Sequence, residues 1–177
     1  MTGNVQLILG GARSGKSRHA ESLAIESDLP VIYVATSDQQ LNLQDEEMLE
    51  RIEHHQNQRP DHWQTVEEPL DLAKVLKQYS SKDNCVLVDC LTLWITNHLL
   101  RDESLQTWQQ AKQELLDILP NLPGRVLLVS NEVGQGVVPL GKLSRQFVDE
   151  AGWLHQEITQ IANGMTFVIA GIPQKLK

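Results

Sequence analysis

The sequence predicts an α/β fold, in which helices flank a doubly wound, mostly parallel sheet. Three observations support this prediction. Short apolar segments alternate along the chain with longer segments whose apolar residues recur at helical spacing. The first apolar segment, residues 5–9, runs directly into the glycine-rich stretch 10–17, which opens a helical pattern near Lys16. No repeat, low-complexity tract or linker interrupts the chain, so we expect a single domain over residues 1–177.

The expected strands are apolar runs bounded by turn residues. Residues 31–36 look apolar on both faces, as in a parallel sheet that helices cover on both sides. In such a sheet, ligands bind at the carboxyl ends of the strands. The predicted strands are residues 5–9, 31–36, 62–67 (a short edge strand), 85–89, 125–130 and 165–170.

The expected helices carry apolar residues at helical spacing and end at proline- or glycine-bearing breaks. Pro30 follows the first helix, and Pro60 follows the second. That second helix begins with acidic residues and ends with cationic ones, an order that suits the helix dipole. The predicted helices are residues 16–26, 45–55, 69–79, 91–100, 105–118 and 143–162.

Charge and cysteine content limit the expected partners and compartment. The chain has 15 Lys and Arg residues against 23 Asp and Glu, and its formal charge of −8 argues against nucleic acid or an anionic membrane as the main partner. Cys85 and Cys90 flank the end of one apolar strand without zinc-site spacing, so we expect buried, reduced thiols. The N-terminus lacks a basic, cleavable leader, and no run of about 18 apolar residues occurs. We therefore expect a soluble, cytoplasmic protein.

The stretch 10–17 reads Gly-Gly-Ala-Arg-Ser-Gly-Lys-Ser and matches the phosphate-loop pattern G-x-x-x-x-G-K-[ST]. Gly10 and Gly15 let the backbone turn tightly and approach a polyphosphate, toward which backbone N–H groups and the next helix N-terminus point. Lys16 would reach the β- and γ-phosphates, and the Ser17 hydroxyl would ligate Mg²⁺. An incidental glycine-rich turn is the alternative, but the strand–loop–helix context favours a nucleoside triphosphate and a P-loop NTPase fold of the RecA-like type. The nucleotide-binding residues expected in this loop are Gly10, Gly11, Ala12, Arg13, Ser14, Gly15, Lys16 and Ser17.

Two acidic residues follow or end predicted strands. Asp89 ends a strand of the V-L-V-D type, where phosphate-loop enzymes place the acid that holds Mg²⁺, directly or through water. The alternative is an ordinary N-cap for the next helix, and the upstream loop favours the metal role. Glu132 follows another strand and could be a base, a metal-shell group or a substrate contact, among which the sequence does not choose.

The adjacent histidines His54 and His55 fall on the predicted second helix. Neighbours on a helix point about 100° apart, so at most one is expected to face a site at the strand ends. Spacing alone favours a solvated face for both. Arg51 and Arg59 lie one turn either side of His55, however, and such a cationic row would suit an anionic ligand.

Several unrelated motifs, in order and at matching spacing, together resemble the bifunctional adenosylcobinamide kinase/adenosylcobinamide-phosphate guanylyltransferase family of cobalamin biosynthesis. The resemblance covers nearly the whole chain. The motifs are the loop 10–17; Arg51-Ile52…His55…Arg59-Pro60…Trp63…Thr65…Glu67; Asp89-Cys90-Leu91-Thr92-Leu93-Trp94…Asn97; Asn131-Glu132-Val133-Gly134…Gly136-Val137-Val138-Pro139; Arg145…Phe147…Asp149…Gly152; and Gly171-Ile172-Pro173.

The resemblance implies two activities on one nucleotide-handling surface. In the first, the aminopropanol hydroxyl of adenosylcobinamide attacks the γ-phosphate of ATP or GTP, assisted by Mg²⁺, Lys16 and backbone N–H groups. In the second, a histidine attacks the α-phosphate of GTP and releases pyrophosphate. The resulting GMP–histidine intermediate passes its guanylyl group to adenosylcobinamide phosphate, giving adenosylcobinamide-GDP.

The resemblance also implies roles for individual residues. The family's histidine in R-I-x-x-H falls on His55, which reverses the solvated-face interpretation and makes His55 and Lys16 the expected catalytic residues. Ser17 and Asp89 are the expected Mg²⁺ ligands. Further nucleotide-binding positions implied by the resemblance are Thr36, Ser37, Gln56, Arg59, Glu67 and Asp89. A homotrimer is implied as well, whereas the contact of the family's arginine at Arg145 is left open.

The chain departs from the family pattern at Val148, where arginine is common, at His155, where asparagine is common, and at Asn163, where an acid is usual. These differences bear on corrinoid contacts or assembly more than on phosphate chemistry. We expect His155 to be a packed or capping residue, not a second nucleophile. Two alternative functions are kept: a P-loop kinase of another small hydroxylated metabolite, and a non-catalytic RecA-like nucleotide switch.

Overall fold

The structure, a computed structural model, describes residues 4–38 and 60–177. The helix predicted over residues 45–55 lies outside the described residues. His54, His55, Gln56 and Arg59 lie outside them too, so their predicted roles stay predictions.

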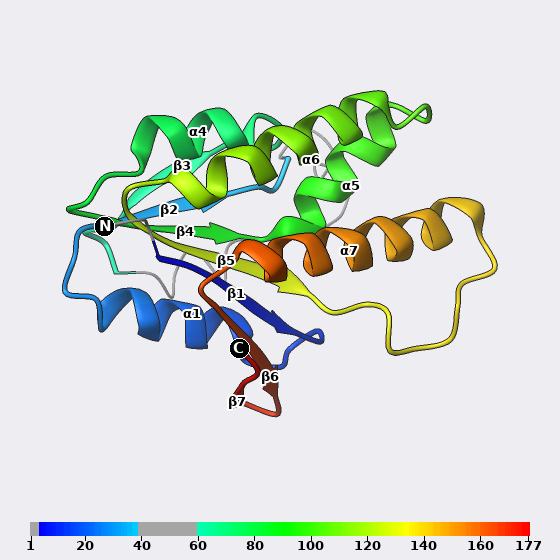
Figure 1. Cartoon of the computed structure of the whole chain (residues 1–177). Helices are drawn as coiled ribbons and strands as arrows, with labels where there is room; N and C mark the ends of the chain where they lie inside the picture. The colour runs from blue at the N-terminus through cyan, green and yellow to red at the C-terminus, as the bar shows by residue number, and fades with distance from the viewer. Residues whose placement is uncertain (1–3, 39–59) are drawn as a thin grey trace.

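Seven strands form one sheet in the order β3-β2-β4-β5-β1-β6-β7 (Figure 1). The pairings among β1 to β6 are parallel, and β7 runs antiparallel to β6. The mostly parallel α/β sheet predicted from the sequence is therefore confirmed, with β3 at one edge as expected. The strands are β1 Asn4–Gly10, β2 Val31–Ala35, β3 Gln64–Glu67, β4 Cys85–Asp89, β5 Arg125–Asn131, β6 Gly164–Ile169 and β7 Ile172–Lys175.

Strand β7 was not predicted from the sequence, in which residues 165–170 were expected to be the last strand. All four residues of β7, Ile172–Lys175, are exposed, and the segment includes Pro173. It therefore shows neither the apolar run of a buried strand nor a clear alternation. Proline is tolerated there because β7 is an edge strand.

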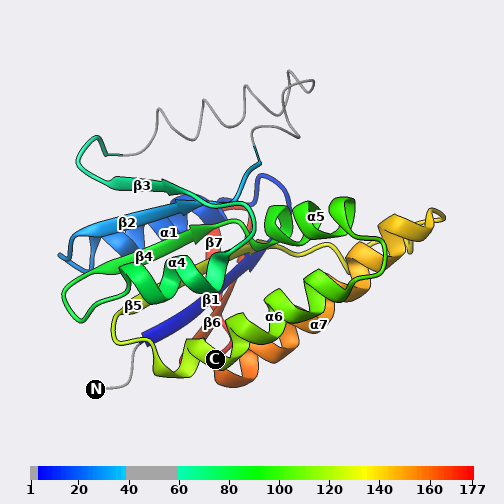
Figure 2. The ribbon, with the colours of Figure 1, turned by 90° about the horizontal axis from the view of Figure 1, so that it is seen from above.

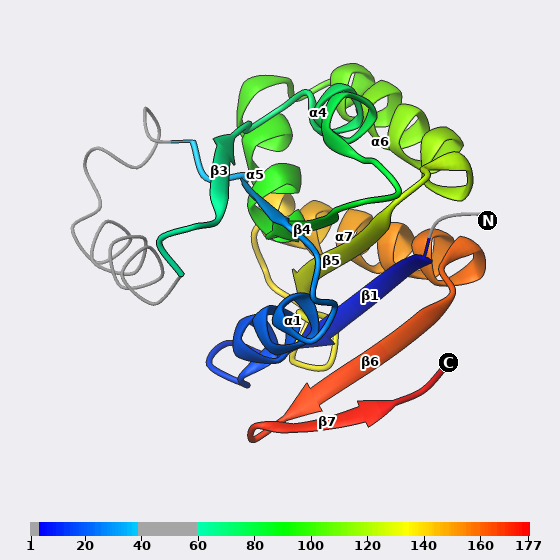
Figure 3. The ribbon, with the colours of Figure 1, turned by 90° about the vertical axis from the view of Figure 1, so that its left-hand side faces the viewer.

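Helices cover both faces of the sheet, as Figures 1 and 3 show: α1 lies on one face, and α4, α5, α6 and α7 lie on the other. Seen from above in Figure 2, α6 and α7 run side by side. Each face has its own buried apolar cluster, and the more extensive one lies under α4 to α7. The helices are α1 Lys16–Ile25, α4 Leu72–Tyr79, α5 Leu91–Arg101, α6 Gln106–Ile118, the 3₁₀ helix η1 Leu119–Asn121 and α7 Lys142–Ile161.

Both cysteines are buried, free thiols, as the sequence predicted. Cys85 and Cys90 belong to the apolar cluster on the α1 face of the sheet. Burial raises the pKa of Cys85 to about 11 and raises that of Cys90 as well, so neither thiol is a reactive thiolate near neutral pH.

His155 lies on α7 and packs against β5. It is 8% exposed, and its Nε2 lies 2.7 Å from the Ser130 hydroxyl. Burial lowers the pKa of this imidazole from 6.5 to about 4, because the charged form would lose its hydration. The expectation that His155 is a packing residue is confirmed.

Acidification should destabilise the fold through His155. In the unfolded chain the His155 imidazole takes up a proton near pH 6.5, whereas in the folded protein the same imidazole stays neutral until about pH 4. In that window the unfolded state binds more protons, so stability falls as the pH falls, by up to about 3 kcal/mol for this group. We expect His155→Asn to lose this share of the acid sensitivity. The measurement is the urea unfolding free energy of both proteins at about pH 7 and about pH 4.5; equal acid sensitivity in the two proteins would contradict the assignment.

Candidate active site

The phosphate loop follows β1 at the edge of the sheet where the carboxyl ends of the parallel strands meet. A Cβ added to Gly10 would lie 2.4 Å from the Ser14 hydroxyl oxygen and 2.7 Å from the Val168 carbonyl oxygen. Gly15, which precedes α1, has φ +94°, a backbone conformation that residues other than glycine rarely adopt. Glycine is therefore required at position 10 by packing and at position 15 by the backbone conformation.

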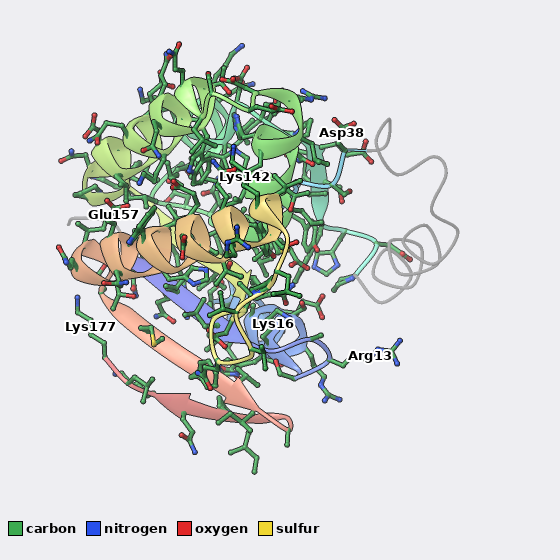
Figure 4. The ribbon with its side chains drawn as sticks, turned by 90° about the vertical axis from the view of Figure 1, so that its right-hand side faces the viewer. Arg13, Lys16, Asp38, Lys142, Glu157 and Lys177 are labelled. Carbon is green, nitrogen blue, oxygen red and sulfur yellow. The ribbon has the colours of Figure 1, made fainter. Side chains whose placement is uncertain are left out.

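Lys16 is the first residue of α1 and is only 9% exposed. Its ammonium group donates to the Gly11 carbonyl oxygen at 3.2 Å, so the side chain folds back over its own loop. Burial lowers the pKa of Lys16, an effect that neighbouring Cys90 and Asp89 partly offset. In Figure 4, Lys16 lies within the fold, whereas Arg13 extends from the surface. A bound phosphate would give the buried ammonium a charged acceptor in place of a neutral carbonyl.

Two serines supply hydroxyl groups in the loop. Ser17 is half-buried in the first turn of α1. The Ser14 hydroxyl oxygen is buried and has no hydrogen-bond partner among the described residues. Buried polar atoms are usually satisfied, so an orphaned hydroxyl in this loop fits a segment that is completed by a ligand.

Asp89 ends β4, which is separated from the phosphate-loop strand β1 by β5. The buried Tyr33 hydroxyl donates to its Oδ2 at 2.7 Å and so fixes the carboxylate. The N-cap of α5 is the next residue, Cys90, so the alternative in which Asp89 caps that helix is not what the structure shows. Tyr33 was not singled out from the sequence, although a tyrosine inside an aliphatic strand usually finds a polar partner.

Thr36 follows β2 and is fully buried. Its hydroxyl donates to the Cys90 carbonyl oxygen at 2.7 Å and accepts from the Cys90 N–H at 2.9 Å. The Thr36 carbonyl oxygen accepts from the Asn97 side chain at 2.7 Å. Thr36 therefore joins the ends of β2 and β4 to α5, and its predicted nucleotide contact stays a prediction, as does that of half-buried Ser37.

Side chains of α5 hold the chain at Thr36 and Asp38, where the described segment 4–38 ends. Asp38 is 5% exposed and forms an ion pair with Arg101 at the end of that helix. Asn97, one turn earlier, donates to both the Thr36 and the Pro69 carbonyl oxygens. Figure 4 shows Asp38 at the edge of the described fold, near α5. Neither Asp38 nor Arg101 was predicted from the sequence, since their ion pair joins segments 63 positions apart.

Glu67 is exposed at the end of the edge strand β3. In the strand order it is four strands from β1, which corresponds to about 19 Å across the sheet. The structure therefore does not bring Glu67 beside the phosphate loop, and one nucleotide would have to extend along the sheet edge to reach both. Its predicted nucleotide contact stays a prediction.

Glu132 and Arg145 shape the loop between β5 and α7. The Glu132 carboxylate accepts from the Gly134 N–H at 2.6 Å. Arg145 donates to the Pro139 carbonyl oxygen at 3.3 Å and also to that of Leu140, which ties the end of the loop to the first turns of α7. These contacts give both side chains a local structural role that the sequence had left open.

Hard oxygen ligands suit Mg²⁺, which usually keeps several waters and binds one or two protein carboxylates plus substrate phosphates. Within residues 4–38 and 60–177, no three His, Cys, Asp or Glu side chains gather as a self-sufficient metal site. The Ser17 hydroxyl and the Asp89 carboxylate are oxygen donors of the required kind, and Asp89 lies near enough to influence the pKa of Lys16. This donor set fits Mg²⁺ bound together with phosphate.

This chain is similar to known proteins over nearly its whole length. A family model described as cobinamide kinase / cobinamide phosphate guanyltransferase matches residues 6–176. The bifunctional adenosylcobalamin biosynthesis protein CobP of Pseudomonas aeruginosa is 56% identical over 171 residues, covering 97% of this chain and 96% of that protein. The corresponding CobU of Escherichia coli is 39% identical over 183 residues, covering 97% and 98%.

Solved structures with low sequence identity share the fold. A protein from Pyrococcus horikoshii, solved in a structural study, has a TM-score of 0.57 at 9% identity, covering 99% of this chain and 87% of that one. The flagellar accessory protein FlaH from Methanocaldococcus jannaschii has a TM-score of 0.53 at 14% identity, covering 99% and 79%. The mostly parallel sheet with flanking helices that the sequence predicts is confirmed.

Removing the Thr36 hydroxyl should destabilise the strand ends. Thr36→Val leaves the buried Cys90 N–H and carbonyl without this partner, and we expect a loss of about 1–3 kcal/mol in the free energy of unfolding. Thr36→Ser keeps the hydroxyl and should lose clearly less. Urea denaturation of the three proteins gives the measurement, and a Thr36→Val protein as stable as wild type would show that the hydroxyl does not join β2 to β4.

Proposed function

The chain belongs to the cobinamide kinase / cobinamide phosphate guanyltransferase family, and on this premise we propose that it acts in cobalamin biosynthesis as a bifunctional enzyme. It phosphorylates adenosylcobinamide and then transfers GMP from GTP to adenosylcobinamide phosphate. The observation that carries the proposal is the phosphate loop with its buried Lys16, in a chain whose similarity to bifunctional relatives extends over 97% of its length.

The kinase step needs a triphosphate whose terminal phosphoryl group is held and neutralised. The hydroxyl oxygen of the aminopropanol arm forms a bond to the γ-phosphorus as the bond to the β,γ-bridging oxygen breaks. The nucleoside diphosphate leaves, and the hydroxyl proton is released. Lys16 and the N–H groups of residues 10–17 hold the phosphates through this step. Mg²⁺, held by Ser17 and Asp89, would neutralise charge on the phosphate oxygens.

In the guanylyltransferase step we propose His55 as the nucleophile. A ring nitrogen of neutral imidazole forms a bond to the α-phosphorus of GTP, and the bond to the α,β-bridging oxygen breaks to release pyrophosphate. An oxygen of adenosylcobinamide phosphate then attacks the same phosphorus, and the imidazole leaves. The motif Arg51-Ile52…His55 supports this assignment, together with the predicted phosphate contacts of Gln56 and Arg59.

Assembly and location are further parts of the proposal. The resemblance to the family supports a homotrimer, and the nearly full exposure of Val137 and Leu140 in the β5–α7 loop offers apolar surface for association. The formal charge of −8 supports a protein without a nucleic-acid partner. None of the described helices is long and apolar enough to cross a membrane. We propose a cytoplasmic location.

His55→Ala should abolish covalent labelling by α-labelled GTP while phosphorylation of cobinamide remains at least partly active. The reason is that His55 is the first acceptor of the guanylyl group, whereas the corrinoid hydroxyl accepts the phosphoryl group. Both reactions share only the triphosphate-binding loop. Intact-mass analysis after incubation with GTP and Mg²⁺ gives the measurement, and the adduct should be acid-labile and alkali-stable.

His54→Ala is the matched control and should label like wild type. Labelling that survives in His55→Ala but disappears in His54→Ala would move the assignment by one residue. Binding of GTP by wild type with neither labelling nor turnover would instead favour the nucleotide switch.

Lys16→Ala should damage both activities, because both need the triphosphate. Removing a charged donor from a preorganised phosphate site typically costs about 100-fold or more in rate. The measurement is kcat/KM for each reaction. Lys77→Ala, which removes an exposed lysine of α4, is the control and should leave both values near wild type. Loss of a single activity in Lys16→Ala would contradict a shared triphosphate site.

A further inference from the structure

The tip of the C-terminal hairpin has a backbone conformation that few residues adopt. Ala170 has φ +51° and Gly171 has φ +80° in the turn between β6 and β7. The flanking residues Ile169 and Ile172 are paired, so the hairpin closes with two residues. Positive φ at both central positions is typical of the type I′ turn, whose twist matches the flanking strands.

This hairpin lies against the phosphate loop from its beginning to its end. At the beginning, Gly10 pairs with Val168 of β6. At the end, the Gly171 N–H donates to the Ser14 carbonyl oxygen at 2.7 Å. A Cβ added to Gly15 would lie 3.2 Å from the Gly171 Cα. Figure 1 shows β6 and β7 beside β1 at the edge of the sheet.

The hydrogen bond from Gly171 constrains the peptide that joins Ser14 to Gly15. In a planar trans peptide, the carbonyl and the N–H point in opposite directions. Because the Ser14 carbonyl is anchored on the hairpin tip, the Gly15 N–H is directed away from the hairpin. The same hydrogen bond polarises the peptide and makes its N–H a stronger donor. The N–H groups of a phosphate loop are the donors that cradle the phosphates.

We propose that Gly171 is a positioning residue for triphosphate binding: its N–H, held by the β6–β7 turn, aims the Gly15 N–H at the bound phosphate. The inference rests on the proposed function only as far as phosphate binding by residues 10–17. It gives a role to the Gly171-Ile172-Pro173 motif, which neither reaction uses directly.

The need for glycine at position 171 is conformational. A Cβ added there would lie 3.8 Å from its nearest neighbour, Arg18 Nη2, so there is space for a methyl group. The φ of +80° is the obstacle, since an L-residue is strained there and would shift the turn that presents the N–H. Ala170 accepts a similar strain, but its position does not supply the donor to Ser14.

The sharpest test replaces Gly171 by glycolic acid, which exchanges its N–H for an ester oxygen without adding a side chain. We expect inorganic tripolyphosphate with Mg²⁺ to bind about three- to tenfold more weakly, the loss of roughly one hydrogen bond's contribution. The KM for GTP should rise by a similar factor, while the KM for the corrinoid stays unchanged. Lactic acid in place of Ala170 removes the neighbouring N–H of the same turn and should leave tripolyphosphate affinity at the wild-type value.

A purely structural role for Gly171 would lower the thermal stability of the ligand-free protein without changing tripolyphosphate affinity, and that result would overturn the proposal. If the ester protein does not fold, a second pair decides. Gly171→Ala should weaken tripolyphosphate binding, whereas Ala170→Gly should not, and equal affinities in both would overturn the proposal.

Failure of the inference and failure of the proposed function give different results. A wild-type protein that binds tripolyphosphate in a Gly171-dependent way, yet transfers neither a phosphoryl nor a guanylyl group, contradicts the proposed function and supports the inference. A wild-type protein that does not bind tripolyphosphate overturns the inference.

Discussion

The close approach of three backbone segments at the end of β1 is the constraint on which the rest of the site depends. Gly10 can sit between the Ser14 hydroxyl and the Val168 carbonyl because it has no side chain. Its own carbonyl accepts from the Glu132 N–H at 3.0 Å, so the residue that follows β5 also holds this point. With the loop fixed from both sides, its N–H groups would need little reorganisation to bind the proposed phosphate, which is the condition for strong electrostatic stabilisation.

The second half of the site is fixed by side chains that reach between strands. Tyr33 of β2 holds the Asp89 carboxylate of β4, and Thr36 bridges to the backbone just beyond it. Asn97 and Arg101 of α5 then hold the chain as it leaves β2. Each of these polar groups is paired at a point where the apolar sheet ends, so the strand ends form a rigid base on which a separate catalytic segment can act.

The sequence predicted most of the fold, because buried parallel strands are apolar runs and the phosphate loop has its own spacing. It missed β7, whose exposed residues carry no periodic signal. Nor did it predict pairings between distant residues. One such pairing is the hydrogen bond from the Trp108 indole N–H to the Glu150 carboxylate at 2.6 Å, which buries an acid between α6 and α7. Thr36 shows the same limit within the site: the sequence singled it out, but the partner of its hydroxyl is the backbone of Cys90, 54 residues away.

A single triphosphate-binding site suits both reactions, because in each the negative charge of the leaving group develops on the β-phosphate. When the γ-phosphoryl group is transferred, the departing oxygen remains on the β-phosphorus of the diphosphate. When the α-phosphorus is attacked, the departing oxygen remains on the β-phosphorus of pyrophosphate. In the proposed function, Lys16 and the loop N–H groups surround the β-phosphate and would therefore stabilise both leaving groups. Because attacking and leaving atoms lie roughly in line, the two nucleophiles must approach from opposite ends of the triphosphate. The hydroxyl acceptor and the imidazole can thus belong to separate parts of the site without competing for position.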